Sequence, residues 1–328
     1  MAKVAEAEGL TPTMGQSPFA ISRGQVFERE LLKNDAERLI AALVEEGVLP
    51  KGAEGFRDLR TRINSGPLAN MDVAHDETVN ALRQLASAGQ RGLEGSSPVV
   101  IASATLKISG QPVMLPEGIL AIDALVARAE DATDRVELLV GEVKSYAYRA
   151  GYTDTTDLAT SRAQAGLYRY ALALTVHELG LGDHLSVAEH GLLVLTRHGS
   201  NRPQILSTED LNYQAARAEA GFERLRAAAK DLEAFDVEDE EDAVERIESA
   251  DVAYRPECVS FCDRAEYCRE EAESKGDGNV LGADVGRFLA GVDLNRTIEL
   301  MGGARPENEV ERDLAERIRE ARGAATAS

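Results

Sequence analysis

A series of three β-type runs, one helix and a fourth β-type run limits the folds open to this chain more than any other feature. Apolar residues alternate or cluster as in strands over 97–110, 111–130 and 136–148. A leucine, alanine and tyrosine stripe at helical spacing then occupies 155–180, and 190–200 is β-rich again. This order predicts a meander of three strands, followed by a helix and a fourth strand.

Helical patterns precede this block. Residues 24–47 carry apolar side chains at roughly helical spacing, which predicts one long amphipathic helix that stops at Gly47. A more polar helical stretch follows at 77–89. The predicted order from the first helix onward is therefore helix, three strands, helix, strand.

The later helices have their own start and stop signals. The helix within 155–180 is expected to begin at an N-cap, Asp157 or Thr160, and to end at Gly180. An alanine-rich helix is expected over 207–235, where a serine precedes acidic residues in the first turn.

Charged residues interrupt the third apolar run, which reads LLVGEVKSYAYRAGY. Glu142 and Lys144 are two positions apart on a strand and therefore point to the same face. Antiparallel pairing through the turn DATDR would bring Asp123, from the preceding run, beside Glu142. Adjacent carboxylates repel each other unless a cation neutralises them, and their hard oxygens suit Mg²⁺ or Mn²⁺. The alternative is a salt bridge between Glu142 and Lys144 at a sheet edge, which contributes little.

These residues resemble the D…(D/E)-x-K signature of the PD-(D/E)XK nuclease superfamily, and the predicted order is similar to its αβββαβ core. In the helix after the lysine, Gln164 and Tyr168 lie one turn apart and look like the Q-x-x-x-Y motif of RecB-type nucleases. In the first helix, GQVFE (24–28) resembles the G-x-x-x-(H/E) element of that group. The resemblance covers residues from about 17 to 200 in the expected order.

The resemblance implies an α/β fold with a restriction-endonuclease-like core, a mixed sheet flanked by helices, and the activity of a Mg²⁺- or Mn²⁺-dependent DNA nuclease. It assigns the metal to Glu28, Asp123, Glu142 and the Val143 carbonyl, and makes Lys144 assist the attacking water. Gln164 and Tyr168 complete the implied catalytic set by orienting the DNA strand or the metal ligands. DNA, single-stranded or with ends, and a helicase or other nuclease-complex subunit are the implied partners. DNA repair, recombination, CRISPR adaptation and phage defence are the implied settings.

Other interpretations of the same residues remain open. Gln164 can simply solvate or cap its helix, Tyr168 can belong to the core, and Glu28 can belong to a solvated glutamate-rich face. A catalytically inactive nuclease-fold subunit that binds DNA ends or a protein partner is the alternative function. An acidic helical interaction protein that matches the motifs by accident is a third.

The three cysteines of the chain, Cys258, Cys262 and Cys268, lie in one polar stretch. Such density is typical of thiolates that hold an iron–sulfur cluster or Zn²⁺. The trio is similar to that of iron–sulfur RecB-type exonucleases, which implies a [4Fe–4S] cluster completed by a cysteine near the N-terminus. Ser17 occupies that place here, so the fourth cysteine is missing. The alternative is a degenerate site in which small apolar thiols pack a helical subdomain.

Composition limits the class of protein. With 328 residues the chain can form one large or two modest domains, and its formal net charge of −21 argues against broad wrapping of nucleic acid but not against a confined site. The absence of a secretory pattern, of a long apolar run and of an even cysteine count predicts a cytoplasmic protein with no membrane partner. The predicted division is an N-terminal helical part, a nuclease core, a helical and acidic connector, and a cysteine-containing helical subdomain, over 1–95, 96–205, 206–250 and 251–328.

Overall fold

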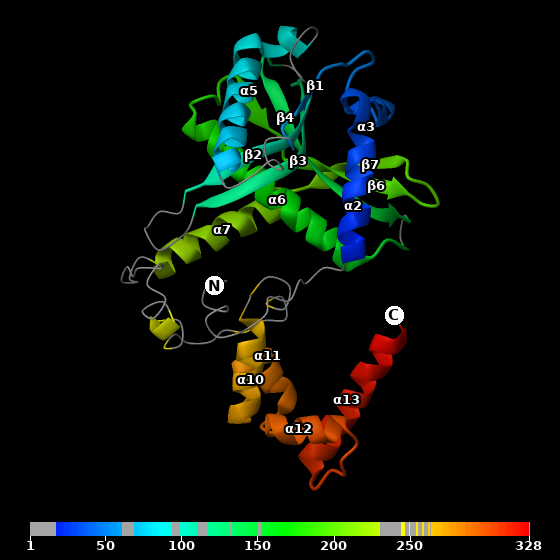
Figure 1. Cartoon of the computed structure of the whole chain (residues 1–328), viewed down its shortest axis with the longest axis vertical. Coiled ribbons are helices and arrows are strands. Elements are labelled where there is room, and N and C mark those ends of the chain that lie inside the picture. Colours follow the sequence, from blue (N-terminus) through cyan, green and yellow to red (C-terminus); the bar gives the residue numbers. More distant parts are fainter. Residues whose placement is uncertain are drawn as a thin grey trace. The chain divides into compact units, whose positions relative to one another are not determined.

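The computed structural model of the chain contains two compact units, Phe19–Ala234 and a second that comprises Phe235–Ser328 with Met1–Pro18. A mixed sheet flanked by helices forms the first unit, and helices form the second (Figure 1). The sequence instead predicts boundaries at 205/206 and 250/251, and strand β7 (Pro203–Asp210) crosses the first of these. The structure describes residues 18–60, 69–93, 99–109, 117–130, 133–149, 152–229, 244–246, 249, 254, 258, 262 and 264–327.

The sheet of the first unit contains the predicted meander. Strands β2, β3 and β4 pair antiparallel in sequence order, and β6 then pairs parallel to β4 after helix α6. Within the described residues the strand order is β1-β2-β3-β4-β6-β7, and β5 pairs with the beginning of β4. The strands are β1 (Phe56–Asp58), β2 (Val100–Ile108), β3 (Gly118–Ala129), β4 (Val136–Tyr148), β5 (Leu185–Val187), β6 (His190–Arg197) and β7 (Pro203–Asp210).

Both faces of the sheet are covered, because its strands are apolar on both sides. In β4, Leu138 and Val140 pack into a core shared with α5 (Ala69–Leu93) and α6 (Thr155–Glu178), whereas Leu139 packs into a core shared with α3 (Lys33–Glu45). This alternation follows from the two-residue period of a strand. Charged side chains at even-numbered positions of β4 before any irregularity therefore face α5 and α6.

The first helical segment is two helices rather than the single predicted one. Helix α2 (Pro18–Leu31) ends before α3, and Asn34, Asp35 and Ala36 have positive φ values at the kink. Asn and Asp tolerate the left-handed region better than other residues with a Cβ, which accounts for the break inside a continuous apolar pattern. The predicted stop at Gly47 agrees with its φ of +75° just past α3.

Helix α6 begins earlier than its sequence signals predict, and the next helix begins later. Asp154 caps α6 through hydrogen bonds from the N–H groups of Thr156 and Asp157, so neither Asp157 nor Thr160 is the N-cap. The stretch predicted to start a helix at 207 is the second half of β7, which pairs with β6, and α7 (Asn212–Ala229) follows. Acidic residues after a serine suit a helix start, but pairing with β6 at the sheet edge overrides that local preference.

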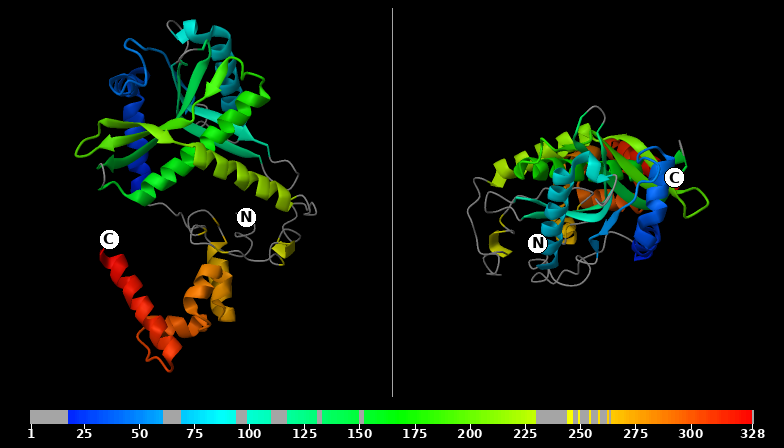
Figure 2. Two further views of the ribbon diagram at one scale, coloured as in Figure 1. Left: turned by 180° about the vertical axis from the view of Figure 1, so that it is seen from behind. Right: turned by 90° about the horizontal axis from the view of Figure 1, so that it is seen from above.

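Helices α6 and α7 pack side by side, as Figure 2 shows from behind. A Cβ at Gly166 would lie 2.8 Å from the main-chain carbonyl carbon of Gln214, so the close approach depends on glycine. We expect Gly166→Ala to lower the free energy of unfolding by roughly 1–3 kcal/mol through overpacking. Gly221→Ala in α7 is the matched control, because no atom lies within 4 Å of the added carbon, and it should stabilise the chain by up to about 1 kcal/mol. Urea unfolding of both variants measures the contrast, and equal effects would contradict it.

The described part of the second unit is helical, as the sequence predicts. Leu289, Leu300, Leu314 and Ile318 meet in its apolar core. No helix among the described residues of the chain is long and apolar enough to cross a membrane. The elements are α10 (Ala265–Lys275), the 3₁₀ helix η2 (Gly278–Leu281), α11 (Ala283–Leu289), α12 (Leu294–Met301) and α13 (Glu309–Ala327).

Candidate active site

Asp123 and Glu142 lie side by side where strands β3 and β4 separate. The regular pairs of these strands end at Ala124 and Gly141, so Asp123 and Glu142 occupy the next positions. There the Val143 N–H donates to Oδ2 of Asp123 at 2.8 Å. The antiparallel register thus places the two carboxyl groups together, as the turn between the strands predicts.

Two local features open the sheet at this point. A Cβ at Gly141 would lie 2.8 Å from the carbonyl oxygen of Ala124, so glycine allows the strands to approach closely before they separate. The register between β4 and β6 then shifts between Val143 and Ala147. Such bulges bend a strand and redirect its side chains, and this one lies at Lys144.

Glu142 is a carboxyl group without compensating hydrogen bonds. Its side chain has no exposed surface, and neither carboxyl oxygen has a hydrogen-bond partner among the described residues. Burial, and next the charge of Asp123, raise the pKa of Glu142 to about 8, although Lys144 acts in the opposite direction. Burial also raises the pKa of Asp123, against the opposing effects of the Val143 N–H and Lys144. Two buried carboxyl groups therefore share a position that favours a cation.

Lys144 joins the carboxyl pair to helix α6. Its Nζ forms an ion pair with Oε1 of Glu142 and donates to Oε1 of Gln164 at 3.2 Å. The Gln164 amide in turn donates to the hydroxyl of Tyr168 at 2.7 Å. Burial lowers the pKa of Lys144, but the charges of Glu142 and Asp123 outweigh it and raise that pKa overall. Since the Lys144 side chain is 31% exposed, its ammonium group also reaches solvent.

Tyr168 serves as a core residue as well as a partner of Gln164. Its ring belongs to the core between the sheet and α6, and burial followed by the Glu142 and Asp123 charges raises its pKa. Five of the residues predicted from sequence are thus contiguous in space: Asp123, Glu142, Lys144, Gln164 and Tyr168.

Glu28 lies on α2, which runs beside the opened part of β4. Near it, Arg23 Nε donates to Oγ of Ser145 at 3.4 Å. Burial, and next the charge of Asp123, raise the pKa of Glu28, whereas Arg60 lowers it. Arg60 Nη1 is 3.9 Å from Oε1 of Glu28 and donates to both carboxylate oxygens of Asp58. Glu28 therefore has a cation partner of its own.

The metal site remains a prediction. In the part of the chain that the structure describes, no group of three or more His, Cys, Asp or Glu side chains is arranged to hold a metal ion. Asp123 and Glu142 nevertheless fit such an ion chemically, because they are adjacent and the oxygens of Glu142 lack hydrogen-bond partners. The assignments of Glu28 and the Val143 carbonyl as further ligands stay predictions.

The cysteine site is likewise a prediction. No disulfide links the three cysteines, all of which are half-buried, and the Cys262 N–H donates to the Cys258 carbonyl at 2.8 Å. Burial raises the pKa of Cys268, with further contributions from Cys262 and Cys258, while Arg264 lowers it. The thiols therefore lie within electrostatic reach of one another, but among the described residues they do not form a metal-binding group. Ser17 lies outside the described residues.

The site also contains residues that the sequence did not indicate. Ser103 of β2 lies opposite Asp123, between the pairs Ala102–Ala124 and Ala104–Ile122, and has a φ of +56°. Strained conformations of this kind in residues with a Cβ concentrate at functional positions. On the other side of the opening, Tyr146 shares a 2.9 Å hydrogen bond with Ser161 of α6. Only the positive φ and the tertiary contacts reveal these residues, and neither has a sequence signal.

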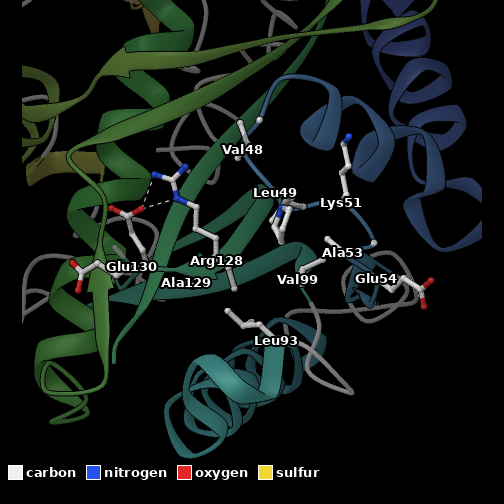
Figure 3. Close-up of a pocket in the computed structure, with 15 residues that line it drawn as sticks. Val48, Leu49, Lys51, Ala53, Glu54, Leu93, Val99, Arg128, Ala129 and Glu130 are labelled. Atoms are coloured by element: carbon white, nitrogen blue, oxygen red, sulfur yellow. Dashed lines mark hydrogen bonds and ion pairs between the residues drawn. The ribbon is translucent and has the colours of Figure 1, made fainter. Parts of the chain in front are cut away.

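A cavity of about 930 Å³ lies at the other end of β3, away from the carboxyl pair (Figure 3). Arg128 at its edge donates from Nε to Glu137 at 2.7 Å and so has its charge matched within the protein. The remaining lining is largely loop backbone and apolar side chains from 47–54, Leu93 and Val99. This cavity therefore lacks the reactive groups found near Glu142.

Comparison of the sequence with protein-family models and with curated proteins gives no match.

Proposed function

We propose that this chain is a metal-dependent nuclease that hydrolyses phosphodiester bonds in DNA, with an active site like that of PD-(D/E)XK enzymes. One observation carries the proposal: a fully buried Glu142 without hydrogen-bond partners lies beside Asp123 and Lys144 where the sheet opens. An ordinary structural salt bridge would satisfy its carboxylate. Here the oxygens are left for a cation that the described residues do not provide.

Each residue of the cluster has a distinct task in this proposal. Asp123 and Glu142 hold Mg²⁺ or Mn²⁺, with Glu28 as a further candidate ligand on α2. When bound, such an ion polarises the scissile phosphate and makes a coordinated water more acidic. Lys144 projects toward solvent and neutralises charge that develops on the phosphate oxygens.

Gln164 and Tyr168 support Lys144 rather than the reaction itself. Oε1 of Gln164 accepts from Lys144, and Tyr168 fixes the other end of the amide through its hydroxyl. This arrangement orients the ammonium group from the helix side, so it stays near Glu142 without losing its reach into the opening. The pair is therefore a positioning device in the proposed reaction.

A cleavage assay tests the function directly. End-labelled single-stranded and double-stranded DNA are incubated with the full chain, and Mg²⁺ or Mn²⁺ should produce shortened products that EDTA abolishes and added Mn²⁺ restores. Lys144→Ala serves as the catalytic control against a contaminating nuclease. Binding of DNA ends without any cleavage under these conditions would instead favour an inactive nuclease-fold subunit. Cleavage that persists in EDTA would contradict the role given to the metal.

A further inference from the structure

A small cavity of aromatic and cationic side chains lies at the far ends of β4 and β6. Its volume is about 600 Å³. The strands are paired there through Ala147 with Thr196 and Tyr148 with Arg197, so the residues after them emerge together. The cavity is lined by Tyr148, Arg149, Tyr152, Arg197 and His198.

The charge of this cavity is opposite to that of the chain as a whole. The formal net charge is −21, yet the lining contains two arginines and a histidine and no carboxylate. Both Arg149 and Arg197 are exposed. Within the described part of the chain, neither guanidinium group forms an ion pair or a side-chain hydrogen bond. These groups are therefore available to an external anion.

The aromatic component is equally exposed. Tyr152 has 90% of its surface accessible, although its N–H donates to the Arg149 carbonyl at 3.1 Å and holds it near that arginine. Tyrosine rings next to arginines form stacking platforms for bases, while the guanidinium groups contact the phosphates between them. A duplex keeps its bases stacked on one another, so this chemistry fits a single strand.

The same strand connects this cavity to the carboxyl pair. From Glu142 to Tyr148 is six residues, or about 20 Å of extended chain, with Lys144 and Tyr146 between them. We propose that the cavity formed by Tyr148, Arg149, Tyr152, Arg197 and His198 binds a single-stranded nucleic acid segment next to the phosphate at Lys144. The inference rests on the proposed function, because this segment is part of the substrate.

Binding in EDTA tests the inference without any need for cleavage. The probe is a fluorescent single-stranded oligothymidylate of about 15 nucleotides, followed by anisotropy at several salt concentrations, with a ribo-oligonucleotide and a blunt duplex measured in parallel. Tyr152→Ala should weaken single-strand binding by about five- to a hundredfold, the effect of losing one stacked base. Arg149→Ala combined with Arg197→Ala should also reduce the salt slope by about 1. Equal losses for DNA and RNA would support the site as a single-strand platform.

A matched control lies on α7. Tyr213 is 69% exposed, and the Arg217 guanidinium lies 5.8 Å from the centre of its ring, so Tyr213→Ala with Arg217→Ala removes the same residue types elsewhere. Its affinity should equal that of the wild type, and melting temperatures check that every variant folds. Unchanged single-strand affinity in the Tyr152 and arginine variants, or no single-strand binding by the wild type, would overturn the inference. DNA cleavage by a wild type whose cavity variants bind normally would refute only this site, whereas loss of binding without cleavage would refute only the proposed function.

Discussion

Lys144→Ala is expected to lower metal-dependent DNA cleavage by at least about a hundredfold while the protein stays folded. The side chain forms an ion pair with Glu142, a hydrogen bond to Gln164 and an exposed surface toward the opening. Alanine removes the cation that balances charge on the phosphate, and no other described lysine or arginine forms an ion pair with Glu142. Initial rates with saturating Mn²⁺ and labelled DNA, together with a melting curve, measure the two effects.

Lys107→Ala provides the matched control. Lys107 is also a half-buried lysine on a strand, β2, and forms ion pairs with Asp72 at 2.6 Å and Glu117 at 2.9 Å. Its loss should leave cleavage unchanged. Lys144→Arg should recover only part of the activity, because a planar guanidinium fork cannot occupy the place of a compact ammonium group. Equal cleavage by the wild type and Lys144→Ala would refute the catalytic role of Lys144.

The strand pattern of the core could be predicted from sequence because each long strand is apolar or alternating over many residues. The three antiparallel strands and the parallel β6 follow that pattern, and the neighbouring positions of Asp123 and Glu142 follow from the turn between their strands. Strands β1 and β5 have three residues each, too few to show any period. Strand β7 ends in Ser-Thr-Glu-Asp, which resembles a helix start, and only its pairing with β6 makes it a strand.

The features that create the opening are tertiary or conformational, so the sequence shows them poorly. A positive φ at Ser103, the bulge after Val143 and the pairing of Arg60 with Asp58 beside Glu28 each depend on what lies across from the residue. The first-helix motif predicts Glu28 as a ligand, but motif spacing says nothing about the competing cation Arg60. Spacing thus predicts which residues approach the site, whereas the packing decides how each is compensated.

A buried carboxylate without hydrogen bonds reduces stability, so Glu142→Gln is expected to abolish cleavage and stabilise the metal-free protein. The amide has nearly the same shape, carries no charge and can donate to Asp123. Since one pKa unit corresponds to about 1.4 kcal/mol, the free energy of unfolding in EDTA at pH 8 should rise by about 1 kcal/mol or more. Function, not stability, would then account for glutamate at this position.

The pH dependence gives the sign of this effect. The Glu142 carboxyl ionises near 4.5 in the unfolded chain but only at about 8 in the fold, so folding takes up a proton between these values. The contribution of the group to stability is complete below about pH 4.5 and is lost as the pH rises toward 8. Urea unfolding in EDTA at several pH values should therefore show a decline in the wild type that is smaller in Glu142→Gln.

Metal linkage and a control on the same strand complete the test. Mg²⁺ or Mn²⁺ should raise the melting temperature of the wild type more than that of Glu142→Gln, because an ion that binds only the folded chain stabilises it by mass action. Glu137→Gln should change stability by no more than about 1 kcal/mol, since that partly exposed carboxylate already pairs with Arg128 at 2.7 Å. A Glu142→Gln protein less stable than the wild type at pH 8 in EDTA would show that Glu142 is a structural ion pair with Lys144, and the cation it is proposed to bind would lose its support.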